Sequence, residues 1–294
     1  MPFHFKKKES VANAVRRLCC ERLDDALEAL ERGAIFQAVH GVRKEIKKLR
    51  SVLRLTRGEI GRKTYRKHTD ALREAANLLT AFRDAQVKLA AFDELMKYSR
   101  RKLPTHPFPE IKTALQENCR AEEKRLGRSI KPLRGILRES KRELDHLKIE
   151  SKGWKAIAPG LKKIYGDGQN AFAIARRKSS DENFHEWRKR VKDLWQQLRL
   201  LRPARPAKLR DRVKNLAQLG ALLGDDHDLF MLKEFVPDKF LKAQDAEALD
   251  KLIRSRQKEL RSAALKLGAR FYQEKPGHFC RRIADYWKSW RSGA

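Results

Sequence analysis

The chain has few of the residues that interrupt helices, with 15 glycines and 10 prolines among 294 residues. Alternating runs of β-branched residues, which are typical of strands, are nearly absent. No apolar run approaches the length of about 18 residues that a membrane-spanning helix requires. Residues 1–8 lack the apolar stretch that signal peptides carry. These absences predict an all-α protein of the cytoplasm.

Cysteine is also scarce, and the four that occur are Cys19, Cys20, Cys119 and Cys280. No two of them are spaced as C-x-x-C, and an adjacent pair suits neither a disulfide framework nor a zinc site. Nucleotide-binding glycine loops are missing, and no Ser/His/Asp or Cys/His grouping stands out as a catalytic set. We therefore expect a reducing compartment, no metal, no cofactor and no catalytic residue.

Negative charge is the third deficit. Asp and Glu number 38 against 69 Lys and Arg, which gives a formal net charge of +31. A charge so far from zero opposes folding through self-repulsion, so it indicates a negatively charged partner such as nucleic acid, anionic lipid or a phosphate polymer. Because 41% of the residues are hydrophobic and recur periodically, the chain is not a disordered basic tail.

The helices are expected between the glycines and prolines that punctuate the chain. The longest predicted loop is Leu103–Pro109, whose three prolines prevent a continuous helix. The apolar periodicity predicts helices at about 7–32, 34–57, 60–82, 84–101, 109–127, 129–148, 154–177, 181–202, 206–223, 227–236, 244–271 and 277–292.

Two distant segments, 40–55 and 185–200, carry nearly the same pattern. Both read H-x-x-R-K-x-φ-K-x-L-x-x-x-L-R-L, where φ is apolar, and at an offset of 145 eight of the sixteen positions are identical. On a helical wheel each segment separates an apolar stripe from an opposite stripe that is basic. The basic stripes comprise His40, Arg43, Lys44, Lys47 and Arg54 in the first copy, and His185, Arg188, Lys189, Lys192 and Arg199 in the second.

Ordinary solvated helix faces mix charges of both signs, because like charges at i,i+4 cost a few tenths of a kcal/mol each. Arg43 and Lys47 are such a pair, and the second copy repeats the pattern. Arginine binds phosphate through two parallel N–H groups and lysine binds it as a mobile point charge. The duplicated stripes therefore predict an anion-binding site made by two helices, against the simpler interpretation of a solvated face.

The duplication extends beyond these helices. Residues 78–84 match residues 222–228 at an offset of 144, and each segment ends in Arg-Asp or His-Asp. We expect Asp84 and Asp228 to lie at structural turns and to open a new helix. The order of elements then repeats in two halves, 1–150 and 151–294, with a boundary near 149–153.

The second of these segments, Asp225-Asp226-His227-Asp228, leaves three alternatives open. Asp at a helix start is a common N-cap, a carboxylate here could pair with a basic helix, and His-Asp also occurs among metal ligands of phosphohydrolases. The counterpart in the first half, Ala81-Phe82-Arg83-Asp84, has no ligand set, which disfavours metal. Other basic residues are possible additional phosphate contacts, and these are Arg16, Arg66, Lys163, Arg210 and Lys214.

The paired H-x-x-R-K-x-φ-K segments, each followed by an Arg-Asp or His-Asp dipeptide, resemble the CHAD domain, the conserved histidine α-helical domain. The resemblance covers about 7–292. It implies two antiparallel helical bundles related by a pseudo-twofold axis, with basic helices around a central cavity or pore. It also implies binding of inorganic polyphosphate through the eight His, Arg and Lys residues of the two motifs, with Arg54 and Arg199 extending both stripes, association with polyphosphate granules and no catalysis.

Some relatives join this domain to a CYTH triphosphatase domain with an E-x-E-x-K motif, which is missing here. The chain is thus expected to be a stand-alone binding module. One departure is Glu45, because the second copy has Arg190 at this position, and the two halves are expected to contribute unequally. The alternatives are a nucleic-acid-binding protein, which the charge alone also fits, and a metal-dependent phosphohydrolase acting through Asp225–Asp228.

Overall fold

A computed structural model describes residues 2–32, 34–99, 108–236 and 243–293. Within these ranges every regular element is helical, which confirms the predicted all-α class. The elements are α1 (Val11–Arg32), α2 (Ile35–Leu55), α3 (Arg57–Ile60), α4 (Arg62–Asn77), α5 (Thr80–Ser99), α6 (Pro109–Asp145), η1 (Gly153–Ala156), α7 (Ala158–Arg177), α8 (Asp181–Leu201), η2 (Arg202–Ala204), α9 (Pro206–Lys233), α10 (Ala243–Phe271) and α11 (Pro276–Ser292).

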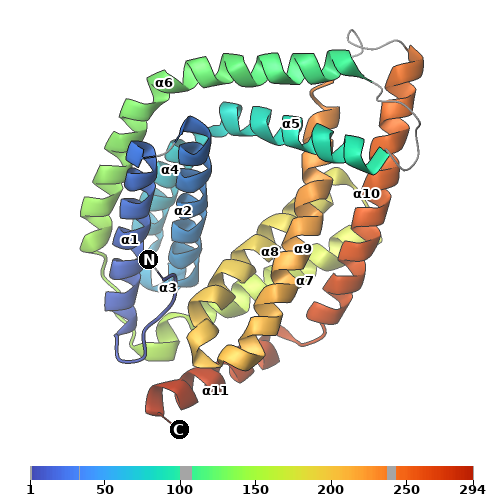
Figure 1. Cartoon of the computed structure of the whole chain (residues 1–294). Coiled ribbons are helices and arrows are strands. Elements are labelled where there is room, and N and C mark those ends of the chain that lie inside the picture. Colours follow the sequence, from blue (N-terminus) through green and yellow to red (C-terminus); the bar gives the residue numbers. More distant parts are fainter. Residues whose placement is uncertain (1, 33, 100–107, 237–242, 294) are drawn as a thin grey trace.

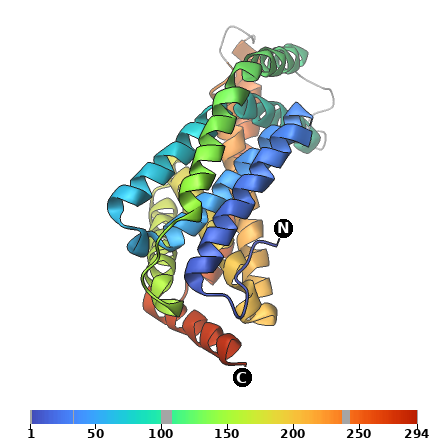
Figure 2. The same cartoon turned by 90° about the vertical axis from the view of Figure 1, so that its left-hand side faces the viewer.

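The helices form two groups that meet along α2 and α8 (Figure 1). In the first group α1, α2, α4 and the last part of α6 lie side by side, and in the second α7, α8, α9 and α10 pack together. Helix α5 extends from the first group to α9 and α10, and the view in Figure 2 shows α6 lying along the outside of α1 and α4. No helix of the described residues is long and apolar enough to cross a membrane.

The apolar stripes predicted for the two duplicated segments are buried. On α2 the stripe is Val42, Ile46, Leu49 and Leu53, each at most 2% exposed. On α8 the corresponding residues are fully buried, and these are Trp187, Val191, Leu194 and Leu198. Both stripes belong to one continuous core that contains residues of both groups. Burial of these stripes fixes the rotation of α2 and α8 about their axes, so their basic stripes point away from the core.

The predicted helix break between residues 127 and 129 does not exist. Residues 109–127 and 129–148 form the single helix α6, which contains Gly127 and Pro132. A proline inside a helix removes one backbone hydrogen bond and bends the helix without necessarily ending it, and Figure 1 shows α6 bending between its horizontal and vertical parts. Of the predicted loop Leu103–Pro109, residues 103–107 lie outside the described ranges, and Pro109 begins α6.

The predicted turns at Asp84 and Asp228 are also wrong. In the first half the break lies earlier, at Leu78 and Leu79, and Asp84 lies within α5. In the second half no break occurs, and Asp228 lies within α9. The buried leucines continue through this stretch at helical spacing, as Leu216, Leu219, Leu223, Leu229 and Leu232. This continuous apolar stripe holds α9 against its neighbours and overrides the local similarity to a capped helix start.

Direct contacts join the two groups where α2 crosses α8. The Ser51 hydroxyl donates a hydrogen bond to the backbone oxygen of Asp193 at 3.3 Å, and Arg54 forms an ion pair with the Asp193 carboxylate. Next to this crossing, Gly160 of α7 packs against the end of α2, where a Cβ atom on Gly160 would lie 2.0 Å from the carbonyl oxygen of Leu55. These contacts set the spacing of the two basic helices.

Candidate polyanion-binding site

The basic stripes of α2 and α8 line one cavity of about 550 Å³, which we call the central cavity. Among the described residues, eleven Lys and Arg side chains but only two carboxylates line it. Nine of the ten predicted residues are part of this lining, and His185 lies beside it. The lining residues are His40, Arg43, Lys44, Lys47, Arg50, Arg54, Arg83, Glu186, Arg188, Lys189, Arg190, Lys192, Asp193, Trp195, Gln196 and Arg199.

On the α2 wall, Lys47 occupies a central position. Its side chain is accessible to solvent but projects into the concavity, where it forms no ion pair or hydrogen bond with a described residue. Burial by the surrounding walls, together with the charges of Lys192 and Arg188, lowers the pKa of Lys47 to about 7.

Arg43 on the same wall has a second role, because it donates hydrogen bonds of 2.9 Å to the Ala76 carbonyl and to the Thr80 hydroxyl beside the α4–α5 break.

On the α8 wall, Arg188 and Lys192 likewise lack ion-pair partners within the described residues. The Nε of Arg188 is buried without a hydrogen-bond acceptor, and burial, with the charge of Arg188, lowers the pKa of Lys192 to about 8. Lys189 is instead paired with Glu186 at 2.7 Å, and Arg199 stacks over the Trp195 ring at 4.7 Å. Arg188 and Lys192 are therefore the cations of this wall that form neither an ion pair nor a stacking contact with a described residue.

The histidines lie among these cations, whose charges oppose protonation of the imidazole rings. Burial and the charges of Arg83, Lys44 and Lys47 lower the pKa of His40. The His185 ring lies 4.0 Å from that of His227, and its Nδ1 is buried without a partner.

His227 was assigned to a possible metal site by sequence. Burial, together with the charges of Arg188 and His185, lowers its pKa to about 3. Protonation of His185 and His227 is therefore unfavourable at neutral pH.

The two aspartates of the duplicated dipeptides lie close to the cavity cations. Burial raises the pKa of Asp84, and the charge of Arg43 acts in the opposite direction. Burial raises the pKa of Asp228, and the charge of Arg188 opposes it. Asp228 interacts with the charges of Arg188 and Lys192 without forming an ion pair among the described residues, and the N-cap interpretation is wrong because Asp228 lies inside α9.

The metal alternative is not supported by the directions of the side chains. Consecutive residues of a helix point about 100° apart, so Asp226 and His227 point away from Asp225 and Asp228, which lie on one face of α9 and line one pocket. Asp226 is buried and accepts a 2.6 Å hydrogen bond from Arg261. Within the described residues, no group of three or more His, Cys, Asp and Glu side chains could hold a metal ion.

Three cations of the cavity lining were missed by sequence reasoning. Arg50 and Arg83 line the central cavity, and Arg190 lines it on the α8 side. Arg50 was detectable because it falls within about 80° of His40 on the wheel, and Arg83 because it precedes Asp84 in the duplicated dipeptide. The comparison of the two motifs indicates Arg190 only as a difference from Glu45, not as a site residue.

Glu45, the counterpart of Arg190, does not face the cavity. It is 6% exposed and forms ion pairs with Lys48 at 2.7 Å and with Arg22 of α1 at 3.0 Å. The two halves are therefore unequal: the first buries a carboxylate at this position, and the second adds a cation to the cavity wall.

The other predicted phosphate contacts lie outside the central cavity. Arg16 donates hydrogen bonds to the Asn13 side chain and to the Leu147 carbonyl. Arg66, Arg210 and Lys214 are exposed on α4 and α9, away from the lining. Lys163 of α7 lines a neighbouring cavity that shares Arg54 and Arg190 with the central one.

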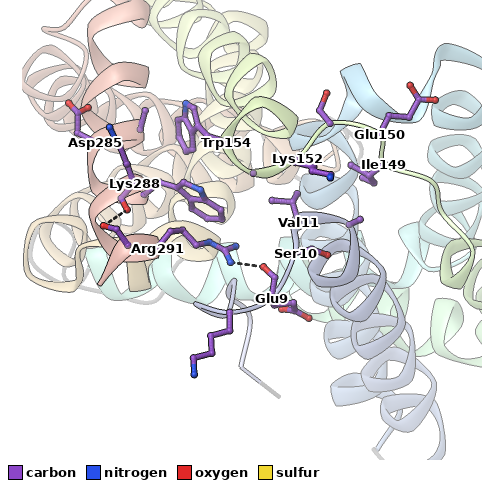
Figure 3. Close-up of a pocket in the computed structure, with 17 residues that line it drawn as sticks. Glu9, Ser10, Val11, Ile149, Glu150, Lys152, Trp154, Asp285, Lys288 and Arg291 are labelled. Atoms are coloured by element: carbon purple, nitrogen blue, oxygen red, sulfur yellow. Dashed lines mark hydrogen bonds between the residues drawn. The ribbon is translucent and has the colours of Figure 1, made fainter. Parts of the chain in front are cut away.

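A larger cavity of about 1020 Å³ lies elsewhere, at the junction of the N-terminal segment, residues 149–154 and α11 (Figure 3). Its four cations face three carboxylates, Glu9, Glu150 and Asp285. Arg291, one of these cations, donates hydrogen bonds to the backbone oxygens of Lys7 and Glu9 and stacks over the Trp287 ring at 4.4 Å. This balanced charge makes the junction cavity a poor site for a polyanion.

Comparisons with known proteins agree with this architecture. A family model described as the CHAD domain matches residues 14–237. PptA from Streptomyces chartreusis has a similar structure, with a TM-score of 0.63 and 12% identity over 90% of this chain and 99% of that chain. The CHAD domain from the plant Ricinus communis is also similar, with a TM-score of 0.55 and 16% identity over 98% of this chain and 95% of that chain. No curated protein matches the chain by sequence.

Proposed function

This chain belongs to the CHAD domain family, and on that premise we propose that it binds inorganic polyphosphate in the central cavity without catalysing a reaction. The ten residues of the duplicated stripes, together with Arg50, Arg83 and Arg190, provide the cations and hydrogen-bond donors. Association with polyphosphate granules is the expected consequence in the cell.

The proposal rests on a set of cavity cations that have no ion-pair partner among the described residues. Lys44, Lys47, Arg83, Arg188 and Lys192 converge on one cavity and form no ion pair with another described residue. Bringing like charges together in a concave site costs free energy. A bound polyanion removes that cost, and a flexible polymer of phosphates can place a negative charge beside each cation along the two walls.

The shape and composition of the cavity favour a bare phosphate chain over nucleic acid. Proteins that bind single strands stack the bases on aromatic side chains, but Trp195 is the one Trp, Tyr or Phe side chain in the described lining, and Arg199 already stacks over it. A cavity of about 550 Å³ is far too small for a duplex. Nucleic acid would therefore reach only the rim of the site.

Competition binding tests the proposal. Fluorescently labelled long-chain polyphosphate is bound to the protein and displaced by unlabelled polyphosphate, duplex DNA or single-stranded RNA at equal phosphate concentration. We expect polyphosphate to displace the probe at least about tenfold more effectively than either nucleic acid, and binding to weaken steeply with salt as counterions are released.

Equal displacement by nucleic acid would contradict the polyphosphate assignment. Phosphate release is followed in parallel with added Mg²⁺ or Mn²⁺, and sustained metal-dependent release would contradict the non-catalytic part of the proposal.

A further inference from the structure

A second basic cavity adjoins the central one. This side cavity, of about 510 Å³, lies between the end of α2, the start of α4 and the start of α7. Five cations and one carboxylate, Asp167, are among its described lining residues. The cations are Arg54, Arg57, Arg62, Lys163 and Arg190.

The two cavities share a wall. Arg54 and Arg190 line both of them, so a ligand that contacts these two guanidinium groups from the central cavity is also at the entrance to the side cavity. Arg50 lies beside this wall, and its pKa is lowered first by burial and then by the charge of Arg54. The Nε of Arg50 is buried and has no hydrogen-bond acceptor within the described residues. Basic groups are thus continuous from Lys47 through Arg50 to Arg62.

The opposite end of the central cavity has a different charge. Beyond Arg83, which lines both spaces, lies a pocket of about 340 Å³ between α5, α9 and α10. Its charged lining residues are Arg83, Glu94, Asp225, Asp228 and Arg256, so carboxylates outnumber cations. A polyanion that continued past Arg83 would meet these carboxylates, whereas one that continued past Arg54 would meet further cations.

We propose that a polyphosphate chain longer than the central cavity leaves it past Arg54 and Arg190 and continues in the side cavity along Arg57, Arg62 and Lys163, while Glu94, Asp225 and Asp228 close the opposite end. This inference rests on the proposed function and adds a direction to it. The site then holds a short chain within the central cavity and gains contacts with a long chain on one side only.

The exposed ends of Arg62 and Lys163 suit this role. Arg62 forms no ion pair with a described residue, and Lys163 is paired with Asp167 at 3.1 Å in an exposed position where such a pair contributes little. Arg57 stacks over the Tyr65 ring at 4.9 Å and so is held in place on the wall. The chain also offers matched controls, because Lys63 and Lys162 are exposed neighbours on the same two helices and do not line the side cavity.

The test compares the double variant Arg62→Glu/Lys163→Glu with the control Lys63→Glu/Lys162→Glu, which changes the net charge equally. Affinities for tripolyphosphate and for long-chain polyphosphate are measured at one salt concentration, and circular dichroism and the melting midpoint verify folding. We expect the test variant to bind long chains about tenfold more weakly than the control. Tripolyphosphate should bind to wild type, test variant and control within about twofold.

A neutral variant, Arg62→Gln/Lys163→Gln, repeats the measurement if charge reversal disturbs folding, and it should give a smaller loss with long chains alone. Equal losses in test and control variants would overturn the directional path, as would a loss for tripolyphosphate as large as that for long chains. If wild type binds neither polymer, the proposed function itself fails. If wild type binds both tripolyphosphate and long-chain polyphosphate, but the test and control variants do not differ, only the directional path is overturned.

Discussion

Lys47 on α2 and Lys192 on α8 project into the same cavity from opposite walls, and neither has an acidic partner within ion-pair distance among the described residues. Burial and the charge of Lys192 lower the pKa of Lys47 to about 7, and burial with the charge of Arg188 lowers the pKa of Lys192 to about 8. The empty cavity therefore loses positive charge within the neutral pH range, where lysines are ordinarily fully protonated.

Polyphosphate binding should weaken as pH rises from about 6.5 to 9. A bound polyanion raises the pKa of both lysines, so binding takes up protons in this range and is strongest where both lysines are already charged. Isothermal titration calorimetry in buffers of different ionisation enthalpy would measure the proton uptake at pH 8. The variant Lys47→Arg keeps its charge at all these pH values and should show a shallower decline, and an unchanged slope would contradict the assignment to Lys47.

Lys47→Met should stabilise the empty protein near pH 6.5. The pKa of Lys47 lies lower in the folded than in the unfolded chain, so the unfolded chain binds more protons between about pH 7 and 10.5, and wild-type stability rises through this window. Because the side chain is accessible to solvent, we expect a gain of only about 2 °C in the melting midpoint. The difference between variant and wild type should vanish toward pH 10, and a constant difference would point to packing instead of charge.

Asp228→Asn should tighten polyphosphate binding by about two- to fivefold, because it removes a negative charge beside Arg188 and Lys192. Asp285→Asn on α11 changes the net charge equally at an exposed position in the junction cavity and should have little effect. Titration with labelled polyphosphate measures both. Loss of a metal-dependent phosphate release in Asp228→Asn would instead support the phosphohydrolase alternative.

Glu45→Gln should lower the free energy of unfolding by about 3 kcal/mol, since it removes a buried counter-charge from Lys48 and Arg22. Glu28→Gln removes the exposed partner of Arg32 and should cost at most about 1 kcal/mol. Urea unfolding gives both values. The folded Glu45→Gln protein should retain its polyphosphate affinity, and a large loss would place Glu45 in the site.

Gly160→Ala should destabilise the protein by at least about 2 kcal/mol, because the new Cβ would overlap the backbone oxygen of Leu55 and force α7 away from α2. Gly58→Ala is the control, as a Cβ there meets nothing within 4 Å and alanine favours the helix. Thermal unfolding would compare the two. Similar midpoints would show that the α2–α7 approach relaxes at little cost.

The basic and apolar faces of α2 and α8 were predictable because burial of a stripe fixes the rotation of a helix. Residues such as Lys47 and Lys192 could be assigned to the site from spacing alone. That the two stripes face each other came from the family resemblance, since it depends on tertiary contacts such as Ser51 with Asp193.

The errors arose where local signals competed with packing. His227-Asp228 resembled a capped helix start, but the leucines on either side keep α9 continuous. Arg43 was expected only in the site, yet it also holds the α4–α5 break through the Ala76 carbonyl. The side cavity could not be predicted, because Arg62 of α4 and Lys163 of α7 are brought to one cavity only by tertiary packing.

The Arg54–Asp193 pair also disfavours the pairing of two first halves. Asp193 occupies the position that Lys48 holds in the first motif, and Arg190 occupies that of Glu45, so the duplicated copies carry opposite charges at two aligned positions. If two first halves met in the same way, Arg54 would face a lysine in place of an aspartate. Two first halves arranged in this way would therefore repel each other at the crossing, because neither supplies the carboxylate with which Arg54 pairs.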